Sequence, residues 1–207
     1  MKIAVVGSGI SGLGAAWLLS REHEVSVFEA NDYVGGHTHT HEIALGDASY
    51  RVDTGFIVCN PDHYPNFFRM LGELGVETQD TTMSFAVRNE RSGLEYNATD
   101  LDRLFIQRRN LLSPRFWSMV RGILRFYREA PALLDLPGEG PDLGDYLDAN
   151  GYGEAFRDDH LVPMASALWS SPSAQILKFP AKYLVAFMAN HQMMVTRDRK
   201  PWRVLRG

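Results

Sequence analysis

Residues 5–19 read VVGSGISGLGAAWLL and contain four glycines where an apolar, strand-like run passes into a helix-like run. Gly7, Gly9 and Gly12 form the pattern G-x-G-x-x-G. In a loop of this kind the first glycine permits a tight turn, and the second lets a pyrophosphate approach the main chain. The third lets the helix pack closely on the strand. The stretch therefore predicts a loop that holds a dinucleotide.

The elements on either side of this loop fit that interpretation. Lys2–Val6 is a β-branched apolar run typical of a buried parallel strand, and residues 10–20 have helical spacing. The helix would begin directly after the loop, so its unpaired amides and its dipole would favour an anion. We assign Ser8, Ile10 and Ser11 to this set of amides.

An acidic residue ends the second strand-like run, residues 24–30. Glu29 lies 22 residues after Gly7, where an acid accepts hydrogen bonds from the ribose hydroxyls of an adenosine. A carboxylate there also disfavours a 2′-phosphate through charge repulsion. We therefore predict that Glu29 and the adjoining Ala30 contact the cofactor, and that residues 2–30 form a βαβ unit.

A glycine doublet, Gly35-Gly36, follows, with His37 and Thr38 directly after it. With this doublet, residues 3–40 resemble the nucleotide-binding signature of the FAD-dependent amine oxidase and protoporphyrinogen oxidase superfamily. The resemblance implies FAD as the cofactor and places Gly35, Gly36, His37 and Thr38 beside its phosphates or flavin. His37 stands where that family usually has arginine, and a histidine is a weaker anion partner near neutral pH.

The resemblance extends over most of the chain. Residues 52–76, 160–172 and 183–194 are similar to a bacterial branch of predicted FAD-dependent oxidoreductases in this superfamily. By that resemblance, the turn with Asp53 and Gly55 brings its main chain close to the cofactor, whereas turn chemistry alone also fits an ordinary loop. The branch is often encoded beside cyclopropane-fatty-acid-synthase-like enzymes, so the resemblance implies a small-molecule substrate, either an acyl lipid or an amine.

We expect an α/β fold: a Rossmann-like FAD/NAD(P)-binding βαβ domain with an inserted, mainly helical substrate or cap region. Residues 1–80 would form the dinucleotide-binding part, residues 81–195 a hairpin and the helical region, and residues 196–207 the start of a return to the nucleotide domain. Helices are predicted over residues 64–74, 115–134, 142–150, 153–169 and 180–194, and hairpins over 39–52 and 83–96. Since members of the branch are considerably longer, the resemblance implies that this chain is an N-terminal portion.

Composition limits the function classes. The 207 residues are 45% hydrophobic and 22% charged, and a formal net charge of −4 gives no global reason to expect a nucleic acid partner. A single cysteine, Cys59, excludes an internal disulfide framework; we interpret it as a small buried hydrophobe rather than a covalent flavin attachment. The N-terminus lacks a signal-peptide pattern, and no window has ~18 consecutive apolar residues. We expect a cytoplasmic protein.

Three histidines, His37, His39 and His41, alternate and would share one face of a strand, as metal ligands do. No cysteine or acidic cluster completes such a site, apart from Glu42, which would face the other side. We therefore expect no metal and a polar strand near the cofactor.

Residues 103–128 contain seven arginines and no acidic residue, with aromatic residues interspersed. A basic amphipathic helix of this kind can make peripheral contact with an anionic membrane surface or admit an acyl or other carboxylate substrate. It also fits an amphipathic core helix with a solvated arginine face, which is the commoner case.

Three functions fit these patterns. The leading hypothesis is an FAD-dependent oxidoreductase whose flavin accepts a hydride, with its catalytic residues unknown. The second is a dinucleotide-binding accessory module that needs a partner chain to complete its sheet. The third is an NAD-linked dehydrogenase, which the Gly-Gly doublet after Glu29 opposes.

Overall fold

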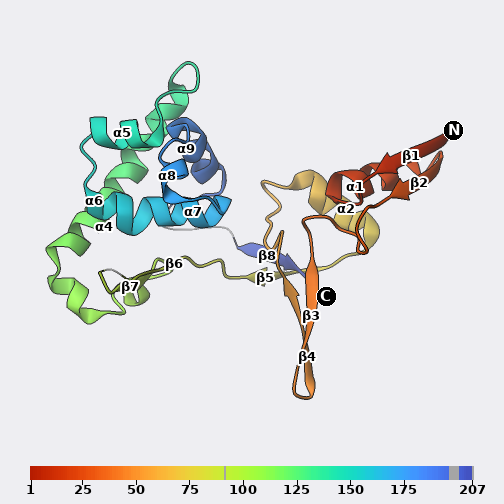
Figure 1. The fold of residues 1–207 in the computed structure, drawn as a ribbon, viewed down its shortest axis with the longest axis horizontal. Helices are drawn as coiled ribbons and strands as arrows, with labels where there is room; N and C mark the ends of the chain where they lie inside the picture. Colours follow the sequence, from red (N-terminus) through yellow and green to blue (C-terminus); the bar gives the residue numbers. More distant parts are fainter. Residues whose placement is uncertain (91, 196–200, 207) are drawn as a thin grey trace. The chain divides into compact units, whose positions relative to one another are not determined.

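The computed structural model describes residues 1–90, 92–195 and 201–206. The chain forms two compact units, which Figure 1 traces by colour along the sequence. The first comprises Met1–Thr81 together with residues 202–206, and the second comprises the described residues from Thr82 to Pro201.

The first unit begins with the predicted βαβ arrangement. Strand β1 (Lys2–Val6) leads into helix α1 (Ile10–Leu19), which is followed by strand β2 (Glu24–Phe28). The two strands pair in parallel along their full lengths, and α1 packs against both. Parallel neighbours need a crossover connection, which α1 provides. The α/β fold with a βαβ unit over residues 2–30, predicted from the glycine pattern, is confirmed.

Strands β1 and β2 are more exposed than their sequences predict. An apolar β-branched run is typical of a parallel strand that is covered on both faces. Here Val6 is 87% exposed and Phe28 is 59% exposed. Within the described residues this sheet has only two strands, with α1 packed against them. The prediction of a buried strand was wrong because burial depends on the neighbouring elements, which the strand's own sequence does not reveal.

An antiparallel hairpin and a helix follow in the first unit. Strands β3 (Thr40–Leu45) and β4 (Ala48–Asp53) pair in antiparallel fashion, and Gly46 in their turn has a φ of 61°. Helix α2 (Pro65–Leu74) ends at Gly75, whose left-handed φ of 68° a glycine adopts without steric cost.

A strand pair that the sequence did not predict completes the first unit. Strand β5 (Thr78–Thr81) pairs in antiparallel fashion with β8 (Trp202–Leu205). The side chain of Arg203 supports this pairing, because its Nε donates to Thr78 Oγ1 at 2.6 Å and its Nη2 to the Thr78 carbonyl at 2.8 Å. A short polar strand gives no periodic signal, and its partner strand lies more than 100 residues further along the chain.

The second unit consists of a short hairpin and a set of helices. Strand β6 (Ala86–Asn89) pairs in antiparallel fashion with β7 (Leu94–Asn97). The helices are α3 (Leu101–Leu104), α4 (Pro114–Glu129), α5 (Leu143–Ala149), α6 (Glu154–Phe156), α7 (Val162–Trp169), α8 (Ser173–Ile176) and α9 (Ala181–Asn190). Figure 1 shows α4 to α9 gathered into one cluster. Within the described residues, no helix combines the length and apolarity needed to cross a bilayer.

Several predicted helices differ from the observed ones at their ends or in their interior. The helix predicted over 115–134 ends at Glu129 and continues as a 3-10 turn, because Pro131 lacks an amide hydrogen and its ring disfavours a further α-turn. The stretch predicted over 153–169 contains a π-turn, Arg157–Leu161, between α6 and α7. The helix predicted over 180–194 ends at Asn190.

The core of the second unit forms around one face of α4. Phe116, Met119 and Phe126 on this helix are buried. The Phe126 ring centroid lies 5.4 Å from that of Phe156 and 5.8 Å from that of Tyr152. The helix therefore uses its apolar face for packing, as an amphipathic core helix does.

We expect Phe126→Ala to lower the free energy of unfolding by about 3–5 kcal/mol, because it removes a fully buried aromatic side chain and leaves a cavity. Leu124→Ala on the same helix is the matched control. Leu124 is 56% exposed, so its truncation should change stability by no more than about 0.5 kcal/mol. Urea unfolding followed by circular dichroism measures both, and equal losses would contradict this description of the core.

Candidate functional site

The glycine-rich loop between β1 and α1 is built by close contact of main-chain atoms. Gly7 has a φ of 92°, and its amide donates to the Phe28 carbonyl on β2 at 2.7 Å. A Cβ added to Gly12 would lie 1.9 Å from the Gly7 carbonyl oxygen. Helix α1 can therefore begin against the loop only because residue 12 has no side chain.

The space beside Gly9 is open. A Cβ added to Gly9 would meet no heavy atom of the described chain within 4 Å, and the φ of −68° at this residue is accessible to any amino acid. The fold itself requires a glycine at position 12, because the Gly7 carbonyl leaves no room for a side chain. At position 9, by contrast, no described part of the chain requires a glycine. A ligand that approaches the main chain here would require it.

The start of α1 offers donors to an anion. Gly9 is the N-cap of α1 and gives no side-chain cap, and the first turn has no acidic residue. Because the first amides of a helix have no intrahelical acceptor, the amides of Ile10, Ser11 and Gly12 are suited to an acceptor from outside the helix. The helix dipole favours a negative charge at the same place.

The glycine doublet packs directly on this loop. The Gly35 amide donates to the Ser8 carbonyl at 3.0 Å, and Gly9 and Gly35 form a parallel bridge. A Cβ added to Gly36 would lie 2.9 Å from the Gly9 Cα, and Gly36 has a φ of 60°. The structure thus brings together two motifs that the sequence separates by more than twenty residues.

Glu29 is hydrogen-bonded to the same loop. Its Oε2 accepts from the Ser8 amide at 2.8 Å and from the Ser8 hydroxyl at 2.5 Å. Its Oε1 accepts from the amides of Ala30 and Asn31 at 2.8 and 2.9 Å, and from Asn31 Nδ2 at 3.2 Å. These bonds, the Ser8 hydroxyl first, lower the pKa of Glu29 to about 2.

Glu29 and Ser8 therefore have partners within the chain. We predicted that the Ser8 amide faces a phosphate and that the Glu29 carboxylate faces a ribose, but in this structure they bond to each other. Five donors already surround the carboxylate, whose two oxygens offer about four lone pairs. A ribose would have to replace some of these bonds.

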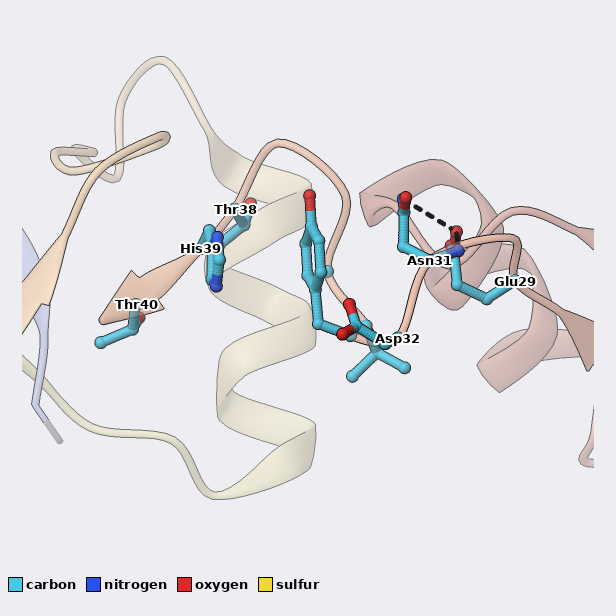
Figure 2. Close-up of a pocket in the computed structure, with 9 residues that line it drawn as sticks. Glu29, Asn31, Asp32, Thr38, His39 and Thr40 are labelled. Atoms are coloured by element: carbon cyan, nitrogen blue, oxygen red, sulfur yellow. Dashed lines mark hydrogen bonds between the residues drawn. The ribbon is translucent and has the colours of Figure 1, made fainter. Parts of the chain in front are cut away.

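A groove of about 710 Å³ lies beside Glu29. Its lining comprises Glu29, Asn31, Asp32, Tyr33, Val34, Gly35, Thr38, His39 and Thr40. Figure 2 shows Glu29 and Asn31 at one end of the groove and Thr38, His39 and Thr40 at the other. Of the residues predicted for the cofactor, the groove thus includes Glu29, Gly35 and Thr38.

Two aromatic side chains that the sequence pattern did not indicate stack in this groove. The rings of Tyr33 and His39 are parallel within 7°, with centroids 4.4 Å apart. The His41 ring follows at 4.0 Å from that of His39, so these two histidines do share one face, as their alternation predicted. The signal in the sequence is an aromatic residue, Tyr33, two positions before the glycine doublet.

His37, Asp53 and Gly55 serve local packing in the structure. A Cβ added to Gly55 would lie 1.7 Å from the His37 carbonyl oxygen, so the observed close neighbour of Gly55 is the main chain of His37. Asp53 Oδ1 accepts from the Thr40 hydroxyl at 2.6 Å. These three residues do not line the groove, and their predicted contact with a cofactor stays a prediction.

Among the described residues, no three histidine, cysteine, aspartate or glutamate side chains are placed together so that they could hold a metal ion.

Cys59 is 1% exposed, and its amide donates to the Arg203 carbonyl at 2.9 Å. Burial raises the pKa of its thiol. Cys59 therefore packs as a small buried residue against β8.

Most arginines of residues 103–128 form ion pairs with acidic residues that lie outside this stretch. Five ion pairs join Arg103 to Asp100, Arg108 to Asp102, Arg115 to Asp159, and Arg125 and Arg128 to Glu129. These pairs neutralise much of the positive charge that the sequence alone shows.

Comparison with known proteins finds a similarity in the first unit. Residues 5–74 match the family model of NAD(P)-binding Rossmann-like domains. A 4,4′-diapophytoene desaturase of Staphylococcus aureus is 43% identical over 75 residues, which cover 35% of this chain and 14% of the desaturase. The chain thus spans a small part of the curated relatives that it matches.

Solved structures share the fold over nearly the whole chain. Cyclohexylamine oxidase from Brevibacterium oxydans superposes with a TM-score of 0.69 at 23% identity, covering 98% of this chain and 45% of the oxidase. A putrescine oxidase superposes with a TM-score of 0.67 at 21% identity, covering 99% of this chain and 46% of the oxidase. At these identities the comparison establishes the fold.

We expect Gly12→Ala to destabilise the first unit by at least about 2 kcal/mol, because its Cβ would collide with the Gly7 carbonyl. Gly14→Ala in the same helix is the matched control. A Cβ at Gly14 meets nothing within 4 Å, so the better helix propensity of alanine should stabilise by about 0.5–1 kcal/mol. Denaturant unfolding measures both, and a tolerated Gly12→Ala would contradict the described loop.

We expect Glu29→Gln to lower the melting temperature at neutral pH, because an amide accepts the loop's hydrogen bonds less well than a carboxylate. The folded pKa of about 2 lies below the ordinary value of 4.5, so this stabilisation is present above pH 4.5 and is lost as the pH falls towards 2. The difference in melting temperature between the two proteins should shrink over that range. Glu22→Gln, at an exposed position, controls for loss of charge; a difference independent of pH would contradict the bonding of Glu29.

Proposed function

We propose that this chain belongs to the FAD-dependent amine oxidase superfamily, binds FAD and forms part of an oxidoreductase. The observation that carries the proposal is the open space at Gly9, next to the start of α1. The loop, the glycine doublet and Glu29 surround this position.

The diphosphate is assigned to the first turn of α1. The amides of Ile10, Ser11 and Gly12 are the donors, and Gly9 allows the phosphate oxygens to come close to the main chain. Gly36 packs on Gly9 without a side chain between them, so the doublet borders this anion site. His37 follows the doublet directly, and its contact with the phosphates is part of the proposal, although its carbonyl packs against Gly55.

The adenosine ribose is assigned to Glu29. The ribose hydroxyls can replace the Ser8 hydroxyl and Asn31 Nδ2 as donors to the Glu29 carboxylate. The main-chain amides of Ala30 and Asn31 keep that carboxylate oriented. The low pKa keeps Glu29 ionised at neutral pH, and its charge opposes a 2′-phosphate. The site therefore suits FAD or NAD better than NADP.

FAD is favoured over NAD by the glycine doublet, which the resemblance associates with flavoenzymes. FAD supplies the capacity to accept a hydride from a substrate C–H or C–N bond. The residues of this chain hold and orient the cofactor. Because the chain spans less than half of the oxidases that share its fold, the catalytic residues, the electron acceptor and the substrate, an amine or an acyl lipid, are proposals for the whole protein.

Flavin binding tests this proposal on the protein expressed from its complete reading frame. We expect the purified protein to show flavin absorption and, after removal of the flavin, to bind FAD more tightly than NAD or NADP in equilibrium dialysis. Gly9→Ala should weaken FAD binding at least about tenfold, because its Cβ fills the space assigned to a phosphate.

The matched control is Gly14→Ala, which should leave FAD affinity unchanged. Gly9→Ala should lower the free energy of unfolding by no more than about 1 kcal/mol, because its Cβ meets no protein atom and only the poorer N-cap preference of alanine counts. Tighter binding of NAD would support the dehydrogenase instead. Binding of FAD only after a second protein is added would support the accessory module. Unchanged FAD affinity in Gly9→Ala would contradict the assigned phosphate position.

A further inference from the structure

The chain between β7 and the first turns of α4 exposes a group of large apolar side chains. They lie on α3, on the 3-10 helix Arg108–Leu112 and the loop before it, and on the start of α4. We call them the apolar tip: Leu101, Ile106, Leu111, Leu112 and Trp117. Leu112 is 89% exposed and Leu101 is 76% exposed. Single exposed apolar residues are common, whereas exposed apolar residues that gather together mark an interaction surface.

Contacts around Trp117 hold the apolar tip together. The Trp117 ring centroid lies 5.5 Å from that of Phe105, the residue before Ile106. Trp117 Nε1 donates to the Leu111 carbonyl at 2.9 Å. The Phe105 amide donates to the Leu101 carbonyl at 3.2 Å, which places Leu101 one turn before the same ring. In Figure 1 this segment runs between β7 and α4, at the end of the second unit away from α5.

Positive charge borders the apolar tip. Residues 101–121 contain five arginines and one acidic residue, Asp102, although the whole chain has a formal net charge of −4. Arg109 and Arg121 are exposed, and neither forms an ion pair with a described acidic side chain. Arg121 lies one turn after Trp117 on the same face of α4. The surface therefore combines apolar side chains with a basic margin.

The apolar tip can enter an apolar phase at little polar cost. The one polar side-chain atom among its five residues, Trp117 Nε1, already donates to the Leu111 carbonyl. Because an unpartnered polar group is what opposes transfer out of water, these side chains are suited to it. Tryptophan favours the boundary between an apolar and a wet phase. Arginine can lay its stem along apolar groups and keep its guanidinium in the headgroup layer.

We propose that the apolar tip binds the surface of an anionic lipid bilayer, with its apolar side chains at the headgroup boundary and the neighbouring arginines against lipid phosphates. Charge decides between this occupant and a second copy of the chain, whose tip would bring the same arginines and repel. The surface differs from the basic amphipathic helix that the sequence suggested, because α4 buries its own apolar face in the core. It belongs to the second unit and does not depend on FAD.

Co-sedimentation with lipid vesicles tests this proposal on the protein expressed from its complete reading frame. One set of vesicles contains equal parts of phosphatidylcholine and phosphatidylglycerol, and the other contains phosphatidylcholine alone. The anionic vesicles should bind the protein at least about tenfold more tightly, because two arginines without acidic partners face them. Added salt should weaken this preference. The double variant Ile106→Ser/Leu112→Ser should weaken binding to the anionic vesicles at least about tenfold, because it removes apolar area that inserts.

Two further variants separate lipid binding from a general effect of substitution, and circular dichroism confirms that each protein is folded. Leu136→Ser is the matched control, because Leu136 is an exposed apolar residue of the same unit outside the apolar tip, and its binding should equal that of wild type. Arg121→Gln should weaken binding to the anionic vesicles and leave binding to phosphatidylcholine unchanged.

Three vesicle results would each overturn the proposal: no binding to the anionic vesicles, equal binding to both lipid compositions, or equal losses in the double variant and Leu136→Ser. A dimer that the double variant dissociates, without vesicle binding by wild type, would assign the apolar tip to a second copy instead.

Discussion

The site depends on the contact between the Gly7 carbonyl and the start of α1. Because residue 12 has no side chain, the helix begins directly against the loop, and its first amides lie next to the open space at Gly9. The doublet at Gly35 and Gly36 then packs on the same main chain. Two close backbone approaches, at Gly12 and at Gly36, each leave no room for a side chain and together form the cradle that we propose to hold an anion.

Glu29 connects this cradle to the second strand. Its bonds to Ser8, Ala30 and Asn31 fix the loop and the turn after β2 relative to each other. The same carboxylate is the group proposed to hold the ribose, so binding would exchange internal donors for ligand hydroxyls. A carboxylate whose pKa is held near 2 stays ionised throughout that exchange at neutral pH.

The sequence predicted the βαβ unit and the superfamily because both rest on local patterns: a β-branched run, G-x-G-x-x-G, and an acid one strand later. The Rossmann-like family model over residues 5–74 and the shared fold of the oxidases confirm the fold, and the superfamily remains part of the proposal. Features that depend on distant residues were missed. They include the pairing of β5 with β8, the bond of Ser8 to Glu29, the stacking of Tyr33 on His39, and the exposure of β1. The cofactor contacts of all the predicted site residues, His37, Asp53 and Gly55 included, stay predictions.

Titration of ¹⁵N-labelled protein with ADP tests the central claim most directly, because ADP carries the diphosphate and the ribose without the flavin. The account predicts saturable amide shifts at Ile10, Ser11 and Gly12, accompanied by a shift of the Ser8 amide as its bond to Glu29 is exchanged. Saturable shifts confined to other parts of the chain, with the amides at the start of α1 unmoved, would contradict it.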